Sequence, residues 1–315
     1  MFHISGFYKF KRIKNIKKIK ELLNNFFTKH GIRGTVIISL EGINGTISSK
    51  KKELELALLK IKKIFNISKF DSQNFAINKF QVFHRGKVKI KKEVVPMGLK
   101  ITKRKTKHHI EPSKWNKLIA NKKTILIDAR KPFEFNVGTF KGAINPEINN
   151  FREFPKYLKK LDKNQKIAMF CTGGIRCEKA SAYFKHKGFK NVFQLEGGII
   201  EYARQVNEKG LENHFIGKNF VFDERRGERI SEHVIAYCHQ CGRPCDSHVN
   251  CANEACHLLF IQCESCQETM ESCCSSDCQE IVNLPEEVQI KLRKGHHKSN
   301  LIFKKGRSEV LKFKH

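Results

Sequence analysis

The first 95 residues place apolar side chains with two spacings, that of an amphipathic helix and that of a strand. A period of three to four residues predicts a helix that ends at Gly31, a residue type favoured just after a helix. Short apolar runs beside turn residues predict strands. The expected elements are helices at 13–30 and 53–65, strands at 2–10, 34–40, 46–49 and 75–83, and a turn at 41–45. This order, βαββαβ, is typical of a ferredoxin-like domain.

The next region alternates strands and helices in a different manner. Between 112 and 205 the pattern predicts strands at 124–128, 166–170 and 192–195, and helices at 177–186 and from about 198 onward. Such alternation is typical of a parallel sheet covered by helices. The lysine-rich residues 86–111 are expected to form an extended linker. Residues 206–288 read as a loop-like, cysteine-rich segment.

Charge is distributed unevenly along the chain. In total, 61 Lys and Arg oppose 31 Asp and Glu, a net charge of +30. Residues 1–110 hold 27 basic and 6 acidic side chains, or +21, whereas residues 206–288 sum to −9. An AT-rich genome can raise the lysine content of a protein. Such a bias would act on the whole chain, however, and would not leave residues 206–288 acidic. The positive regions therefore indicate a polyanionic partner, most simply a nucleic acid, in preference to an anionic membrane.

The sequence contains no run of about 18 uncharged apolar residues, so a membrane-spanning helix is not expected. Its basic start, residues 1–20, lacks the apolar core and cleavage site of a secretory signal. A cytoplasmic protein is the resulting expectation.

A short segment after the strand at 166–170 carries the clearest chemical signal. Cys171 stands where that strand ends, and two glycines lead into the next helix. Open α/β sheets bind ligands at the carboxyl ends of their strands. The following amides can curl around the sulfur, and the helix N-terminus and Arg176 add positive charge. The pattern predicts a thiol with a lowered pKa that holds an anionic sulfur species.

This segment resembles the active loop of the rhodanese domain, with Cys171, Gly174 and Arg176 in the matching positions. Three further stretches resemble the same family, namely LIDAR at 126–130, GTFKGAIN at 138–145 and LEGG at 195–198. Four residues separate Cys171 from Arg176, a loop sized for sulfur. Cysteine-dependent phosphatases of related shape have five, which argues against a phosphatase.

The likeness extends over nearly the whole chain. Residues 34–48, the loop with its extension CTGGIRCEKASA, and residues 238–263 together resemble the rhodanese-related tRNA uridine hydroxylase family. This resemblance implies an acylphosphatase-like (ferredoxin-like) domain, a central rhodanese domain and a cysteine-rich C-terminal region. Together with the periodicity and charge, it gives these expected bounds: the first domain at 1–95, a basic linker at 96–116, the rhodanese domain at 117–211, the cysteine-rich region at 212–288 and a basic tail at 289–315.

The same resemblance implies an enzyme that forms 5-hydroxyuridine at wobble position 34 of tRNA, with O2 as co-substrate. Cys171 and Arg176 are then the expected catalytic residues. The loop backbone that serves them comprises Thr172, Gly173, Gly174 and Ile175. Cys177 either resolves an oxidised Cys171 or fills the first helical turn as a small buried residue, and the sequence supports both equally.

Ten of the twelve cysteines fall between 238 and 278. Two CxxC pairs, Cys238 with Cys241 and Cys263 with Cys266, have the spacing of a tetrahedral zinc site. The other candidate ligands are Cys245, Cys251, Cys256, Cys273, Cys274, Cys278, His239, His248 and His257. An iron–sulfur cluster and metal-free thiols are the alternatives to zinc.

Two other functions compete with hydroxylation. A rhodanese loop alone favours a sulfurtransferase that carries a persulfide on Cys171 and passes sulfur to a thiol or to tRNA. A zinc-containing RNA-binding protein with an inert rhodanese domain is the non-enzymatic alternative, but an inert domain would not need to keep Cys171.

Overall fold

The computed structural model describes residues 1–98, 109–148 and 150–294. The chain forms two compact units. The first unit comprises 1–129, 150–212 and 222–225, and the second comprises 130–149, 213–221 and the residues from 226 onward. Most of the expected basic tail, from 295 on, and the middle of the expected linker, 99–108, lie outside the described residues. Among the helices of the described ranges, none has the length and apolarity of a membrane span.

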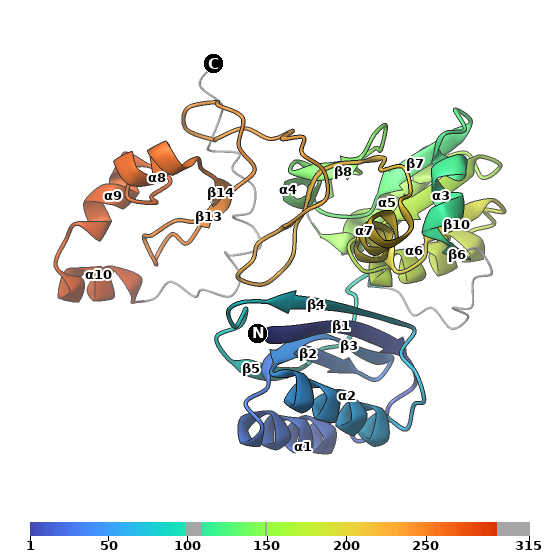
Figure 1. Cartoon of the computed structure of the whole chain (residues 1–315), viewed down its shortest axis with the longest axis horizontal. Helices are drawn as coiled ribbons and strands as arrows, with labels where there is room; N and C mark the ends of the chain where they lie inside the picture. The colour runs from blue at the N-terminus through green and yellow to red at the C-terminus, as the bar shows by residue number, and fades with distance from the viewer. Residues whose placement is uncertain (99–108, 149, 295–315) are drawn as a thin grey trace. The chain divides into compact units, whose positions relative to one another are not determined.

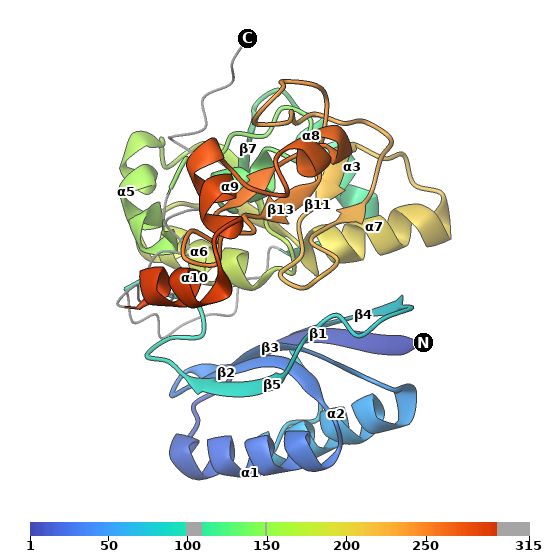
Figure 2. The ribbon, with the colours of Figure 1, turned by 90° about the vertical axis from the view of Figure 1, so that its left-hand side faces the viewer.

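The N-terminal domain of the first unit is a five-stranded sheet with two helices on one face (Figures 1 and 2). Its strands follow the order β4-β1-β3-β2-β5. Apolar side chains of both helices pack onto the sheet in one core, in which Leu23, Ile38 and Ile61 are fully buried. The elements are β1 (Phe2–Phe10), α1 (Ile16–Lys29), β2 (Arg33–Ser39), β3 (Gly42–Ser49), α2 (Lys51–Phe65), β4 (Ser72–Asn78) and β5 (Gly86–Ile90).

The ferredoxin-like order is confirmed for the first six elements, and three details differ. The turn between β2 and β3 takes only Leu40 and Glu41, because pairing continues to Ser39 opposite Gly42. The last expected strand ends at Asn78 rather than at residue 83. The linker assignment is wrong at its start, where β5 pairs in parallel with β2 and buries Val88. The alternating lysines of β5 obscured the apolar pattern of this edge strand, since their side chains point away from the core.

A four-stranded parallel sheet, in the order β6-β10-β9-β7, forms the centre of the rhodanese region of the first unit. Its strands are β6 (His109–Ile110), β7 (Thr124–Asp128), β9 (Lys166–Phe170) and β10 (Val192–Leu195). The helices are α3 (Pro112–Ile119), α6 (Ile175–His186) and α7 (Gly198–Lys209), with short turns η1 (Phe151–Glu153), α5 (Phe154–Tyr157) and η2 (Leu158–Lys160). The expected parallel α/β arrangement is confirmed.

The same sheet begins upstream of residue 117, the expected start of the rhodanese domain. Strand β6 pairs with β10, although both of its residues were assigned to the linker. Trp115 on α3 is fully buried and its ring meets that of Phe170 edge-on, with the centroids 6.3 Å apart. A two-residue strand followed by a proline-started helix carries too little periodicity to be recognised in a lysine-rich sequence.

The second unit holds the cysteine-rich region and is more regular than a loop. Strands β8 (Gly138–Phe140), β11 (Phe215–Asn219) and β12 (Glu228–Arg229) form one small sheet, and β13 (His248–Asn250) pairs with β14 (Leu259–Ile261). The helices are α4 (Pro132–Phe135), α8 (Glu264–Thr269), α9 (Ser276–Val282) and α10 (Glu286–Arg293). One of its apolar clusters consists of cysteine for more than half of its members. Such a core is small for the number of elements it supports.

Candidate functional site

Cys171 lies at the carboxyl end of β9, in a backbone cradle that leads directly into α6. The amide of Gly174 donates a hydrogen bond to the Cys171 sulfur over 3.2 Å. Gly174 has a φ of +91°, a conformation that L side chains rarely adopt, and this turn directs the amides toward the sulfur. Helix α6 begins at Ile175, two residues earlier than expected, because the loop turns tightly enough to join the first helical turn. The predicted position of the thiol at a strand end and a helix start is confirmed.

The cradle lowers the pKa of Cys171 to about 6. Burial alone would raise that pKa, since the sulfur is shielded from water. A hydrogen bond from the Cys177 thiol, the charge of Arg176 and the amides of both residues outweigh burial. At neutral pH the thiolate therefore predominates, which is the nucleophilic form of cysteine.

Cys177 and Arg176 both take part in this arrangement. Arg176 donates a hydrogen bond from Nη2 to the hydroxyl of Thr172 over 3.1 Å, which keeps its side chain against the loop. Cys177 is fully buried, and its pKa is raised well above its usual value by burial and by the hydrogen bond to Cys171. Its thiol thus stays protonated and serves as a donor to the Cys171 thiolate. A structural role for Cys177 requires burial, and a resolving role requires contact with Cys171. The structure shows both features.

A second helix start supports the loop from behind. The amides of Ile199 and Ile200, in the first turn of α7, donate to the carbonyls of Cys171 and Thr172 over 3.0 and 3.2 Å. A Cβ on Gly198 would lie 2.5 Å from the Cys171 carbonyl oxygen, so only glycine fits there. The sequence motif LEGG indicated a turn, but its packing against the Cys171 loop is visible only in the fold.

Alkylation of Cys171 should follow a titration with a midpoint near pH 6, because only the thiolate reacts. Cys177 should show no such reaction below neutral pH. The two can be measured separately by mass spectrometry, since trypsin cleaves after residues 166, 176 and 179 and releases each cysteine on its own peptide. Arg176→Ala should move the midpoint upward, as it removes the positive charge. A wild-type midpoint near the free-thiol value of about 8.5 would contradict the cradle described above.

The two predicted CxxC pairs come together in the second unit. The sulfurs of Cys238, Cys241, Cys263 and Cys266 all lie within 4.8 Å of one another. Those of Cys241 and Cys263 are 3.6 Å apart. Tetrahedral zinc with bonds of about 2.3 Å requires sulfur separations of about 3.8 Å. The first tetrad, as we call these four cysteines, therefore places four thiols close enough together to hold one metal ion.

A second tetrad, which the spacing alone did not pick out, consists of Cys251, Cys256, Cys274 and Cys278. Cys274 lies 3.7 Å from Cys256 and 3.7 Å from Cys278, measured between sulfurs. Neither Cys245 nor Cys273 belongs to these two groups of the described residues, and none of the candidate histidines does. The chain fold selects the four, because β13, β14 and α9 bring together cysteines that are up to 27 residues apart.

Three family models match successive parts of the chain. The UPF0176 acylphosphatase-like domain matches residues 2–94, the rhodanese-like domain matches 111–205, and the rhodanese C-terminal model matches 216–279. A solved rhodanese-related protein from Thermoplasma volcanium is 28% identical, with a TM-score of 0.28 over 31% of this chain and 92% of that chain.

Curated relatives match over most of the length. A tRNA uridine(34) hydroxylase of Pelagibacter ubique is 54% identical over 78% of this chain and 81% of its own. One of Yersinia pestis is 43% identical over 96% of this chain and 87% of its own. The chain belongs to the tRNA uridine(34) hydroxylase family. Membership confirms the family suggested by the sequence motifs, together with its acylphosphatase-like, rhodanese-like and cysteine-rich parts.

Sequence reasoning missed two residues that lie beside the loop of this family member. A Cβ on Gly174 would lie 3.3 Å from the hydroxyl of Tyr8, and a Cβ on Gly173 would lie 3.8 Å from the side-chain nitrogen Nδ2 of Asn74. Both side chains come from the N-terminal sheet. No local pattern on β1 or β4 distinguishes them, so only the packing of the first unit identifies them.

Proposed function

We propose that this protein hydroxylates uridine 34 of tRNA and that Cys171 is the essential reactive group. The observation that carries the proposal is the Cys171 thiolate, held by the Gly174 amide and Arg176 in a chain that is 43% identical to a tRNA uridine(34) hydroxylase over 96% of its length. The product would be 5-hydroxyuridine and the co-substrate O2, as the sequence resemblance implies. One oxygen atom would enter the uracil ring, and two electrons from an external reductant would convert the other to water. Arg176 and the backbone of Thr172, Gly173, Gly174 and Ile175 would stabilise negative charge on the sulfur.

Cys177 would act as the resolving thiol in this scheme. Its hydrogen bond to Cys171 supports the role, because a disulfide between the two requires close approach of their sulfurs. The same hydrogen bond also lowers the pKa of Cys171. Cys177 would therefore stabilise the Cys171 thiolate before oxidation and form a disulfide with Cys171 after oxidation.

Zinc is the metal that we assign to the two tetrads. Four thiolates at tetrahedral spacing prefer zinc, and the site has no open position for a substrate. Bound zinc would supply folding energy to a region whose apolar core is small. The role of these eight cysteines would then be structural, separate from the chemistry at Cys171.

The N-terminal half would bind tRNA mainly through phosphates. Residues 1–110 carry a net charge of +21, which supports a polyanion-binding surface. The dissociation constant for tRNA should rise about a thousandfold between 50 and 200 mM salt, as for a protein with at least six phosphate contacts. Filter binding or fluorescence anisotropy at several salt concentrations measures this. A dissociation constant that does not change with salt would contradict it.

A sulfurtransferase remains the second candidate, because the Cys171 cradle has the size and charge to hold a persulfide. Two assays separate the candidates. Purified protein is incubated with tRNA and either O2 with a reductant or thiosulfate, and the nucleosides are then analysed by mass spectrometry. Addition of oxygen to uridine 34 would support hydroxylation. Addition of sulfur instead would identify the protein as a sulfurtransferase.

The cellular test uses a strain that lacks the gene. Its tRNA should lack hydroxylated uridine 34, and expression of this protein should restore it. Unchanged wobble nucleosides in both strains would refute the proposed function.

A further inference from the structure

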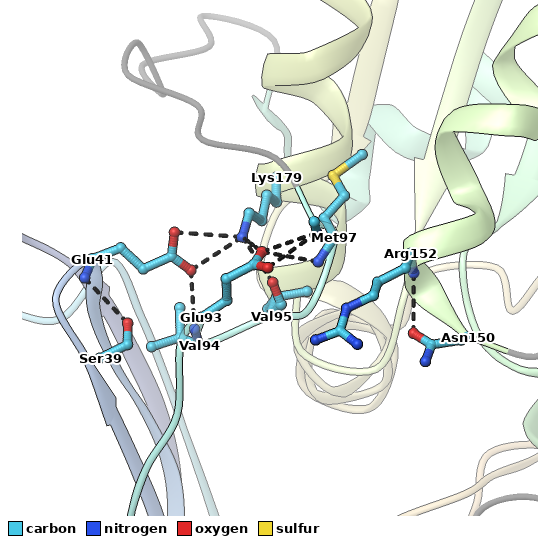
Figure 3. Close-up of polar contacts among 10 residues, drawn as sticks. Ser39, Glu41, Glu93, Val94, Val95, Met97, Asn150, Arg152 and Lys179 are labelled. Carbon is cyan, nitrogen blue, oxygen red and sulfur yellow. Dashed lines mark hydrogen bonds and ion pairs between the residues drawn. The ribbon is translucent and has the colours of Figure 1, made fainter.

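Lys179 on α6 is a fully buried lysine whose ammonium group lies between two carboxylates (Figure 3). Its Nζ contacts Oε1 of Glu41 at 3.1 Å and also pairs with Glu93. It donates a third hydrogen bond, over 2.8 Å, to the carbonyl of Val95. A buried ammonium is stable only when its donors are satisfied in this way.

The two carboxylates are themselves fixed by backbone amides. Glu41 accepts a hydrogen bond from Val94 over 2.9 Å, and Glu93 accepts one from Met97 over 2.9 Å. Burial would raise the pKa of Glu93, but the hydrogen bonds from Lys179 and Met97 lower it overall. The side chains of Glu41 and Glu93 are only 14% and 18% exposed. The ion pairs are thus a rigid, largely dehydrated contact and differ from a surface salt bridge.

This contact joins the N-terminal domain to the helix that forms the active loop. Glu41 lies in the turn between β2 and β3, and Glu93 follows β5. Lys179 lies on the second turn of α6, whose first turn carries Arg176 and Cys177. All of these residues belong to the first unit. The ion pairs of Lys179 therefore connect the N-terminal sheet to the helix that follows Cys171. Their loss would allow the sheet to move relative to the Cys171 loop.

The N-terminal sheet also lies beside the Cys171 loop. Cys171 is only 1% exposed. Tyr8 of β1 and Asn74 of β4 lie beside Gly174 and Gly173. The amide of Gly6 holds the Asn74 side chain through Oδ1 over 3.2 Å, which leaves its amide nitrogen on the loop side.

We propose that Lys179 is a positioning residue, whose ion pairs with Glu41 and Glu93 hold the N-terminal sheet over the Cys171 loop. The sheet carries Tyr8 and Asn74 to the glycines of the Cys171 loop, and the basic N-terminal domain presents bound tRNA to that loop. The effect on tRNA rests on the proposed function, whereas the covering of Cys171 does not.

The test is Lys179→Met, which keeps an unbranched side chain as far as Cε and removes the ammonium group. The rate of Cys171 alkylation by iodoacetamide should increase about tenfold, because the sheet no longer covers the loop. Mass spectrometry of the Cys171 peptide, residues 167–176, measures this rate without contribution from other cysteines. Lys185→Met, on the same helix, is the matched control and should stay within about twofold of wild type.

Turnover with tRNA gives an independent readout. Lys179→Met should lower kcat on the order of a hundredfold, because misplacement of a bound substrate costs that much, while the dissociation constant for tRNA stays nearly constant. Lys179→Arg, which keeps the charge, should restore part of kcat. A residue that only stabilised the fold would lower the amount of active protein and leave kcat of the folded fraction unchanged.

A second variant covers the case in which Lys179→Met does not fold. The triple substitution Lys179→Met, Glu41→Gln and Glu93→Gln removes every buried charge of the contact and keeps the acceptors for the amides. It should show the same increase in Cys171 alkylation. Wild-type alkylation in a folded variant would overturn the proposal. If wild-type protein fails to modify uridine 34, the proposed function falls, and the alkylation rates still decide the role of Lys179.

Discussion

Replacement of Cys171 with serine should abolish hydroxylation of uridine 34, with a loss of at least about a thousandfold in kcat. The reason is that serine cannot form a thiolate, and the hydroxyl that replaces it has no comparable nucleophilicity near neutral pH. The cradle otherwise stays intact, since the Gly174 amide can donate to an oxygen as it does to sulfur. The dissociation constant for tRNA should remain within about twofold, because the proposed phosphate contacts lie in the basic N-terminal half and not at Cys171.

The measurement is nucleoside analysis of tRNA from a deletion strain that expresses each variant, with tRNA binding measured on purified protein. Cys245→Ser is the matched control, since Cys245 is buried but lies outside the active loop and both tetrads. It should support normal modification. Full modification by Cys171→Ser would remove the thiol from the mechanism and leave the rhodanese domain as a scaffold.

Removal of metal should unfold the cysteine-rich part of the second unit. We expect two zinc ions per chain, one in each tetrad, because the four sulfurs of each set lie within 4.8 Å of one another and zinc takes four thiolates. Structural zinc sites contribute apparent binding energies of about 10–16 kcal/mol, which is comparable to the whole stability of a typical domain, about 5–15 kcal/mol. Elemental analysis of protein purified without chelator gives the stoichiometry. Limited proteolysis after treatment with a chelator reports the loss of structure.

Single substitutions assign each ion to its tetrad. Cys266→Ser should lose the ion of the first tetrad and Cys274→Ser that of the second, each leaving one zinc per chain. Cys273→Ser, a buried cysteine outside both groups, should retain two. Metal-free protein that resists proteolysis in this region would refute the assignment, and iron in place of zinc would indicate a cluster.

The sequence alone determined the features that depend on neighbours in the chain. Periodicity predicted helices α1 and α2 and the strands β7, β9 and β10, because apolar spacing within one element sets which face is buried. The cradle of Cys171 was also predictable, since a strand end, two glycines, a helix start and Arg176 all lie within six residues. The first tetrad followed from two local CxxC pairs.

The tertiary structure alone decided which distant residues meet. Strand β5 belongs to the N-terminal sheet because it pairs with β2, more than 50 residues earlier, and its own lysines conceal this. The second tetrad consists of four of six otherwise equivalent cysteines, chosen by the path of β13, β14 and α9. Lys179 looks like one of many surface lysines in a chain of net charge +30. Its burial between Glu41 and Glu93 depends on the packing of two domains, and packing leaves no periodic signal at a single position.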